Sequence, residues 1–160
     1  MVQTTYPSPV GMLTLASDGE AITGLWLKGQ KYFTLPADTP RNDTLPIFLE
    51  AKAWLDAYFG EKPLPPLPPL SPAGTAFRQE VWSLLLEVPY GATTTYGALA
   101  RELNGRGCAA SPRAVGGAVG HNPISILIPC HRVLGADGSL TGYAGGVEAK
   151  RFLLELETED

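Results

Sequence analysis

The sequence predicts an α/β protein in two parts: a small N-terminal α/β domain with an antiparallel sheet, and a mainly helical C-terminal domain with a helix-turn-helix. Three observations predict this fold. Alternating apolar residues flank a turn signal near the N-terminus, a proline-rich segment divides the chain, and apolar residues then recur at helical spacing. With 160 residues the chain can form one sizeable domain or two small ones. We expect domains over residues 1–60 and 73–160.

Two strands and one helix are expected in the N-terminal domain. Residues 12–17 and 22–27 alternate as strands do, and Asp18-Gly19 between them is a hairpin signal. From Leu45 to Phe59 the apolar residues recur at helical spacing, and Gly60 is a suitable C-terminal stop. Together these elements predict a small α/β unit.

The segment between the two domains, residues 61–72, contains six prolines. Proline excludes a helix or a central strand and favours polyproline II. Such a segment is either a ligand for a proline-binding module or a stiff connector, and we favour the connector. We therefore interpret residues 61–72 as a linker.

Helices dominate the expected C-terminal domain. Thr94 or Thr95 is placed to cap one helix, and Ser111-Pro112 is a cap followed by a first-turn proline that opens the next. Two short helices joined by a turn predict a helix-turn-helix. The helices are expected over about residues 76–87, 96–103, 113–120 and 147–157, and a hairpin over 133–143.

The expected helix over 113–120 is rich in glycine. Gly116, Gly117 and Gly120 each cost on the order of 1 kcal/mol of helix stability relative to alanine. A face of alanine and glycine lets another backbone approach closely. That backbone belongs either to a neighbouring helix or to nucleic acid, and the residues alone leave both interpretations open.

The run Ile128-Pro129-Cys130-His131-Arg132-Val133 carries the clearest chemical signal. A thiol reacts as its thiolate, which a neighbouring base or cation favours, and His131 and Arg132 supply both. Residues 124–128 are apolar enough to be buried, and Pro129 forces a turn where the thiol lies. The alternative is a buried structural cysteine, which is common in proteins.

Composition narrows the possible functions. The net charge of −4 argues against a partner held mainly by bulk electrostatics, although residues 101–151 carry six basic and three acidic side chains. No apolar run approaches membrane-spanning length, and the N-terminus lacks a signal-peptide pattern. We expect a cytoplasmic protein without membrane attachment, whose two cysteines, Cys108 and Cys130, are free thiols.

Several motifs together resemble the O6-alkylguanine-DNA alkyltransferases, also called methylated-DNA–protein-cysteine methyltransferases. The similarity covers Phe77 to Glu157 in the family's order, and the Cys-His motif is highly specific; the first seventy residues match in outline. The matching motifs are Pro129-Cys130-His131-Arg132-Val133, Asn122-Pro123, Arg113-Ala114-Val115-Gly116-Gly117, Thr95-Tyr96-Gly97 and Gly142-Tyr143-Ala144-Gly145-Gly146.

The resemblance implies a self-consuming DNA repair protein that moves an alkyl group from O6-alkylguanine, and from O4-alkylthymine, to its own cysteine. Cys130 would be the nucleophile, and His131 would take the thiol proton through water. Glu157, 27 residues after the cysteine, would orient the histidine. Asn122 would brace the turn before the active-site segment. No cofactor and no metal are implied, because the acceptor is the protein itself.

The resemblance also implies double-stranded DNA as the partner, approached through the minor groove. The damaged nucleotide must leave the base stack to be reached. Arg113 would fill the vacated space, Tyr96 would push the adjoining phosphate, and Ala114, Gly116 and Gly117 would lie against the groove. The guanine pocket would be lined by Val133, Tyr143 and Ala144. We expect a monomer and leave open whether it clusters along DNA.

One departure from the family lies before Arg113, where residues 104–112 are about three residues longer than expected. Other functions are weaker. A zinc site of Cys108, His121, Cys130 and His131 lacks a standard ligand spacing. A non-catalytic relative that recognises alkylated guanine would lack the cysteine, and a cysteine hydrolase draws its histidine from a distant position. A helix-turn-helix transcription factor needs more than alanine and glycine to contact base edges.

Overall fold

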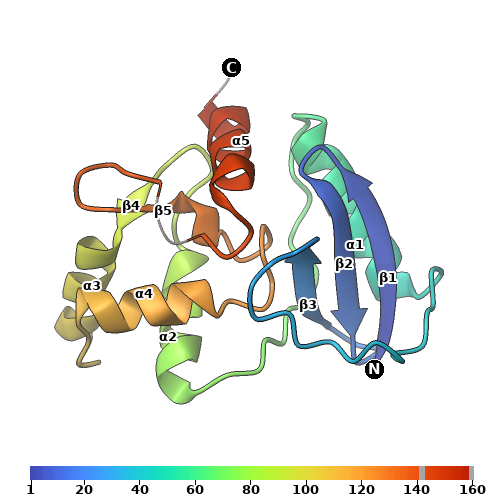
Figure 1. The fold of residues 1–160 in the computed structure, drawn as a ribbon, viewed down its shortest axis with the longest axis horizontal. Helices are drawn as coiled ribbons and strands as arrows, with labels where there is room; N and C mark the ends of the chain where they lie inside the picture. The colour runs from blue at the N-terminus through green and yellow to red at the C-terminus, as the bar shows by residue number, and fades with distance from the viewer. Residues whose placement is uncertain (141–142, 159–160) are drawn as a thin grey trace.

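The computed structural model describes residues 1–140 and 143–158. Figure 1 shows two groups of elements, with the sheet and α1 on the right, α2, α3 and α4 on the left, and α5 above and between them. The sheet contains β1 (Val2–Ser8), β2 (Gly11–Ser17) and β3 (Ile22–Leu27), and α1 covers Pro46–Phe59. The expected fold class, an antiparallel sheet followed by a mainly helical region, is confirmed.

The sheet is antiparallel with the order β1-β2-β3, so the predicted hairpin of β2 and β3 is present. The strand β1 was not expected from the sequence. It lies at an edge, and Thr4 is its buried residue, so its sequence lacks the apolar alternation that marks a half-buried strand. The helix α1 begins at Pro46 and packs Phe48, Leu55 and Tyr58 into the core.

The proline-rich segment is more than a connector, because part of it pairs with the sheet. Leu70 forms a parallel bridge with Ile22 of β3. Ile22 N donates to Pro69 O at 2.8 Å, and Ser71 N donates to Ile22 O at 2.8 Å. The end of the segment is therefore fixed to the outer edge of β3, where a proline neighbour is tolerated.

Four helices follow, close to the ranges that the sequence predicts. They are α2 (Ala76–Leu85), α3 (Tyr96–Gly105), α4 (Pro112–Gly120) and α5 (Val147–Thr158). Thr95, rather than Thr94, caps α3 by accepting a hydrogen bond from Ala98 N, and Ser111 caps α4 by accepting one from Ala114 N. The helices α3 and α4 pack against each other and against α2.

The turn between α3 and α4 is held by side chains as well as by backbone. The amide of Asn104 donates to Ala110 O at 2.7 Å and accepts from Ala110 N at 3.2 Å. Arg106 pairs with Glu87 and Glu102, both at 2.9 Å. The hydrogen bonds of Asn104 therefore close the longer turn before α4, and Arg106 adds exposed ion pairs at its start.

The first arm of the hairpin predicted over residues 133–143 pairs with a distant strand. Val133–Leu134 forms β5, which pairs in parallel with β4 (Thr94–Thr95). Each residue of β5 pairs with the residue 39 positions earlier in the chain. A turn follows, in which Gly135 N donates to Ser139 O at 3.0 Å. Residues 141 and 142, in the predicted second arm, lie outside the described residues. The parallel partner could not be read from the turn signal, because it lies far away in the sequence.

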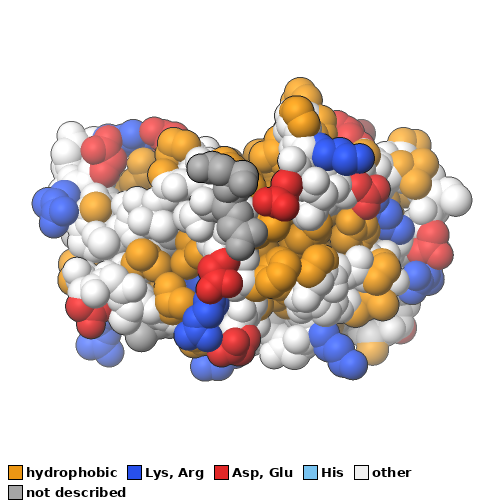
Figure 2. Space-filling model, turned by 90° about the horizontal axis from the view of Figure 1, so that it is seen from above, with side chains coloured by type: hydrophobic (Ala, Val, Ile, Leu, Met, Phe, Trp, Pro, Cys, Tyr) orange, Lys and Arg blue, Asp and Glu red, His pale blue; other side chains and the backbone are white. Residues whose placement is uncertain are grey.

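Charged side chains of both signs are scattered over the face in Figure 2, and apolar side chains gather in its middle. That face shows no continuous basic surface. Among the described residues, no helix is both long enough and apolar enough to cross a membrane.

Candidate active site and nucleic-acid interface

The segment that carries Cys130 is attached to the same edge of β3 as the proline-rich segment. Leu25 N donates to Pro123 O at 2.8 Å, and Ser125 N donates to Leu25 O at 2.9 Å. After Pro129, residues Cys130–Arg132 form a short 3-10 helix, η1. Cys130 is 4% exposed, so the predicted burial of this segment and the turn at the thiol are both present.

Asn122 holds the turn between α4 and η1. Its side-chain oxygen accepts from Ile124 N at 3.0 Å, and its amide donates to Ile128 O at 2.9 Å. These bonds close a loop of backbone just before the cysteine, at the turn where the resemblance places Asn122. Asn122 is 2% exposed, so its amide is fixed without competition from solvent.

His131 and Glu157 meet in the interior although α5 ends one residue later. His131 Nε2 lies 2.5 Å from Glu157 Oε2, and both side chains are at most 1% exposed. His131 Nδ1 is also buried and has no hydrogen-bond partner among the described residues. The imidazole is thus oriented from one nitrogen and has its other nitrogen available for a proton.

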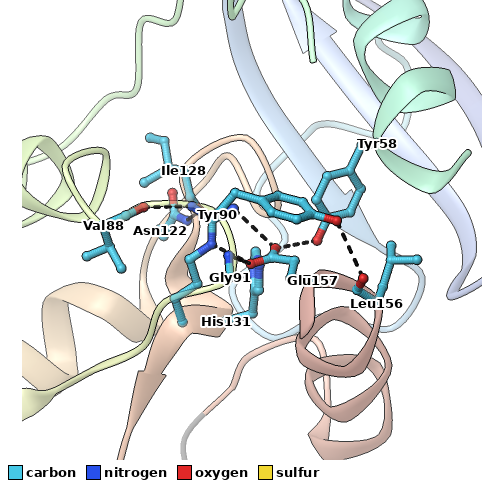
Figure 3. Close-up of polar contacts among 10 residues, drawn as sticks. Tyr58, Val88, Tyr90, Gly91, Asn122, Ile128, His131, Leu156 and Glu157 are labelled. Carbon is cyan, nitrogen blue, oxygen red and sulfur yellow. Dashed lines mark hydrogen bonds and ion pairs between the residues drawn. The ribbon is translucent and has the colours of Figure 1, made fainter. Parts of the chain in front are cut away.

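Glu157 receives more donors than the sequence predicted. Arg132 donates through Nε to Oε1 at 2.7 Å and through Nη2 to Oε2 at 3.2 Å. Tyr58 of α1 donates its hydroxyl to Oε2 at 2.5 Å. Figure 3 shows Tyr58 and His131 next to the carboxylate of Glu157. Burial raises the pKa of Glu157, but the bonds from His131 and Arg132 outweigh it and lower the pKa to about 2.

The thiol and the imidazole are both shifted toward their neutral forms. Burial raises the pKa of Cys130, while hydrogen bonding from Asn122 and the positive charge of Lys150 act in the opposite direction. Burial lowers the pKa of His131, although Glu157 opposes that shift. A neutral thiol beside a neutral imidazole is the state from which a proton can pass from sulfur to nitrogen.

Lys150 was not singled out as a site residue by the sequence. Its ammonium donates to Val133 O at 2.5 Å, and the residue is fully buried. It fixes the backbone of Val133, the predicted pocket residue next to η1. The pKa of Lys150 is lowered by burial, while Cys130 acts to raise it, so these two groups interact electrostatically. The sequence did hold one sign of this role, because helical spacing places Lys150 on the same face of α5 as the buried Leu153 and Glu157.

The predicted DNA-contacting residues lie on and beside α4. Arg113 and Ala114 are exposed on its first turn, and Val115 on the opposite face is buried. Tyr96 lies against Gly116, because a Cβ at that glycine would be 3.8 Å from the tyrosine ring. A Cβ at Gly117 would meet nothing within 4 Å. Packing inside the described protein therefore does not require glycine at position 117.

A cavity of about 610 Å³ lies beside this face of α4. Tyr143 and Ala144, both predicted pocket residues, line it together with glycines of α4 and of the segment before α5. Burial raises the pKa of Tyr143 well above its usual value, and the negative charge of Cys130 adds to that shift. Tyr143 therefore connects the cavity to the cysteine, which does not itself line it.

The N-terminal half contributes a wall of this cavity that the sequence did not indicate. Gly29, Lys31 and Tyr32 line it, and Lys31 N donates to Ala144 O at 3.2 Å. The ring of Tyr32 stacks on His121 at the end of α4, with their centroids 3.8 Å apart. His121 thus lies at the C-terminal end of α4.

The alternative sites are not supported by the geometry. Among residues 1–140 and 143–158, no group of three or more His, Cys, Asp or Glu side chains is arranged to hold a metal ion. Cys108 is a partly buried free thiol that packs against the core. The turn around Asn104 draws Cys108 inward, since Cys108 N donates to Leu103 O at 2.9 Å.

The fold and the site together define a class of protein in which a buried cysteine, histidine and glutamate lie next to a small-residue helix and a cavity. Two family models match the chain: the ribonuclease-like domain of 6-O-methylguanine DNA methyltransferase over residues 1–71, and its DNA binding domain over 76–159. The chain belongs to this family.

Curated relatives and solved structures agree with the family models. A methylated-DNA–protein-cysteine methyltransferase of Haemophilus influenzae is 50% identical over 155 residues, which cover 96% of this chain and 84% of that one. One from Mycobacterium tuberculosis is 46% identical over 153 residues, covering 96% and 90%. The crystal structure of Mycobacterium tuberculosis OGT in complex with DNA matches with a TM-score of 0.87 and 43% identity, covering 99% and 93%.

Proposed function

We propose that this protein repairs DNA by moving an alkyl group from O6-alkylguanine to Cys130 Sγ. The observation that carries the proposal is the buried arrangement of Cys130, His131 and Glu157 in a chain of this family. The same site would accept O4-alkylthymine, whose alkyl group is also attached to an exocyclic oxygen. The proposed reaction needs no cofactor, because the protein is the acceptor.

The proposed proton path begins at the thiol. Its proton passes through a water molecule to His131 Nδ1, the ring nitrogen that the hydrogen bond to Glu157 leaves available. The imidazolium that forms is stabilised by the carboxylate of Glu157, which stays ionised because its pKa is about 2. Glu157 is thus the orienting group of a nucleophile–base–carboxylate arrangement.

The transfer itself exchanges one bond for another. The Sγ lone pair of the thiolate attacks the alkyl carbon, so an S–C bond forms while the C–O6 bond breaks and its electron pair stays on O6. The guanine anion takes up one proton from solvent at N1, which restores neutral guanine. His131 gives the proton that it received from the thiol back to solvent, so the net result is the exchange of the thiol proton for the alkyl group. A thioether has no ionisable proton and is a poor leaving group, so the product is permanent and each protein molecule reacts once.

The DNA would bind with α4 against the minor groove. The thiol is 4% exposed, so a base inside a duplex cannot reach it and must rotate out, at a cost of a few kcal/mol. Arg113, exposed on the first turn of α4, would occupy the space in the stack, and Tyr96 would press on the neighbouring phosphate. Gly117, which internal packing does not require, would admit the DNA backbone.

The flipped base would enter the cavity that Tyr143 and Ala144 line. Val133, the third pocket residue that the resemblance implies, does not line this cavity but follows η1 directly. The hydroxyl of Tyr143 is buried and has no hydrogen-bond partner in the described part of the chain, which suits a contact with the base. Asn122 would keep the Cys130 turn in place during the reaction. We keep residues 1–60, 61–72 and 73–160 as the proposed domains and linker.

Mass spectrometry tests the proposal directly. The protein is incubated with a duplex that carries one O6-methylguanine, and the intact protein and its peptides are weighed. We expect one methyl group on the Cys130 peptide, in one-to-one ratio with repaired guanine. Cys130→Ala should gain no methyl group, and Cys108→Ala should react as the unmodified protein does. Repeated turnover without an adduct would instead favour a hydrolase, and binding without an adduct a recognition protein.

A further inference from the structure

Tyr58 joins the N-terminal half to the active site through one hydrogen bond. It lies in the last turn of α1 and donates to a carboxylate 99 residues later in the chain, Glu157 Oε2, at 2.5 Å. The oxygen that receives this bond is the one that faces His131 Nε2. Figure 3 shows this bond between Tyr58 and Glu157. Tyr58 is 1% exposed, so the bond is shielded from water.

The position of Glu157 explains why it needs such a partner. It lies in the last turn of α5, which ends at Thr158, and a final helical turn frays unless it is held. Arg132 holds the carboxylate from η1, on the same side of the molecule as His131. Tyr58 approaches from α1, so it restrains the carboxylate from a separate element.

We propose that Tyr58 is a positioning residue for alkyl transfer, whose hydroxyl holds Glu157 Oε2 toward His131 and so makes the reaction depend on the docking of α1. This inference rests on the proposed function, because it assigns a role within that site. Tyr58 touches neither the thiol nor the base; it acts through Glu157.

A second tyrosine shows what a merely structural bond of the same kind looks like. Tyr6 donates its hydroxyl to Asp56 Oδ1 at 2.6 Å, and Asp56 is also on α1. That bond is exposed and reaches no group of the candidate site. Tyr58 and Tyr6 thus make nearly equal hydrogen bonds to carboxylates, and they differ in what the carboxylate does.

The proposed role predicts in which direction the pH dependence of the transfer rate moves when Tyr58 is changed. The hydrogen bond from the Tyr58 hydroxyl draws negative charge from Glu157 Oε2. Removing that hydroxyl makes the carboxylate a stronger partner for the imidazolium, which raises the pKa of His131. His131 accepts a proton only when neutral, so the acid limb of the transfer rate should move to higher pH. The ionisable groups that face the His131–Glu157 pair are Tyr58 from α1, Tyr90 before α3, Cys130 and Arg132 from η1, Tyr143, and Lys150 from α5.

The test measures single-turnover methyl transfer from an O6-methylguanine duplex across pH, using the full chain. We expect Tyr58→Phe to lower the plateau rate constant about tenfold, as loose positioning does, and to move the acid limb to higher pH. The matched control, Tyr6→Phe, should change neither. Site-specific 3,5-difluorotyrosine at position 58 keeps the shape but donates more strongly, so it should move the acid limb to lower pH.

Each outcome decides something. If Tyr58→Phe transfers with the rate and pH profile of the unmodified protein, Tyr58 has no positioning role. If it loses stability but keeps the acid limb, the bond is structural. If Tyr58→Phe does not fold, the fluorinated variant decides, because an unmoved limb there overturns the proposal. If the unmodified protein itself gains no methyl group, the proposed function fails instead.

Discussion

The polar groups around Glu157 and the groups that line the cavity beside α4 are arranged in opposite ways. Around Glu157 the side chains are buried, and both carboxylate oxygens have at least two donors, counting His131 Nε2 and Gly91 N. The cavity is lined by glycines, the half-buried His121 and the exposed Tyr32, and a Cβ at Gly117 would meet open space. The proposed chemical centre is thus preorganised inside the protein, whereas the proposed recognition face leaves space beside α4 for a partner.

The largest effect is expected when the negative charge of Glu157, which the buried donors surround, is removed. Glu157→Gln leaves the guanidinium of Arg132 buried without its anion, and breaking a buried pair costs roughly 3–5 kcal/mol of unfolding free energy. Methyl transfer should fall by two orders of magnitude or more, as expected when a triad member is lost. Urea unfolding and single-turnover kinetics measure the two effects.

The control for that substitution is Glu155→Gln, which removes an exposed carboxylate from the same helix. It should leave both the unfolding curve and the transfer rate unchanged. Equal losses in the two variants would mean that α5 needs acidic charge in general, and the special role of Glu157 would be wrong.

A smaller effect is expected on the open side, and there stability and binding should move in opposite directions. Gly117→Ala adds a methyl group that meets no protein atom within 4 Å, so it should stabilise α4 by up to about 1 kcal/mol. The same methyl group should weaken duplex binding about tenfold, because it occupies the space left for the DNA backbone. Thermal unfolding and fluorescence anisotropy with an undamaged duplex measure the two changes.

Gly105→Ala is the matched control, since a Cβ there also meets nothing within 4 Å, and Gly105 ends α3 rather than lying on the α4 face. It should raise stability without changing affinity for DNA. If Gly117→Ala binds DNA as tightly as the unmodified protein, α4 does not face the duplex backbone at that residue.

The smallest effect should come from the ion pairs of the turn. Arg106 pairs with Glu87 and Glu102, and about half of each side chain is exposed. Exposed pairs contribute little, so Arg106→Gln should leave the midpoint of thermal unfolding and the methyl-transfer rate almost unchanged. A large loss of transfer would show that the longer turn sets the position of α4, and that the recognition face is less independent than its open packing indicates.

The sequence predicts the local features of this molecule well. Thr95, Ser111 and Pro112 act within their own turns, so caps and helix starts could be identified without tertiary information. The Cys-His motif and Glu157 were identified through a family resemblance, and the structure brings His131 and Glu157 together. Whether the named residues perform the proposed roles is still a prediction.

What the sequence could not predict depends on distant contacts. Tyr58 fits the apolar face of α1, and nothing local indicates a bond to a carboxylate 99 residues away. Tyr32 lies in a loop without a motif, and its stacking on His121 depends on how the two halves meet. The parallel pairing of β5 with β4 was missed for the same reason, since turn signals predict neighbours and not remote strands.

The way in which the sheet is bordered has a consequence for how the protein behaves in a crowded solution. Gln3 of β1 exchanges hydrogen bonds with Pro40 and Asn42, so the outer edge of β1 is occupied there. The opposite edge, on β3, is occupied by the segments around Leu70 and Ile124. A bare strand edge is a template for the strands of other molecules. By bordering its sheet with its own loops, this protein removes much of that template and thereby resists edge-to-edge aggregation.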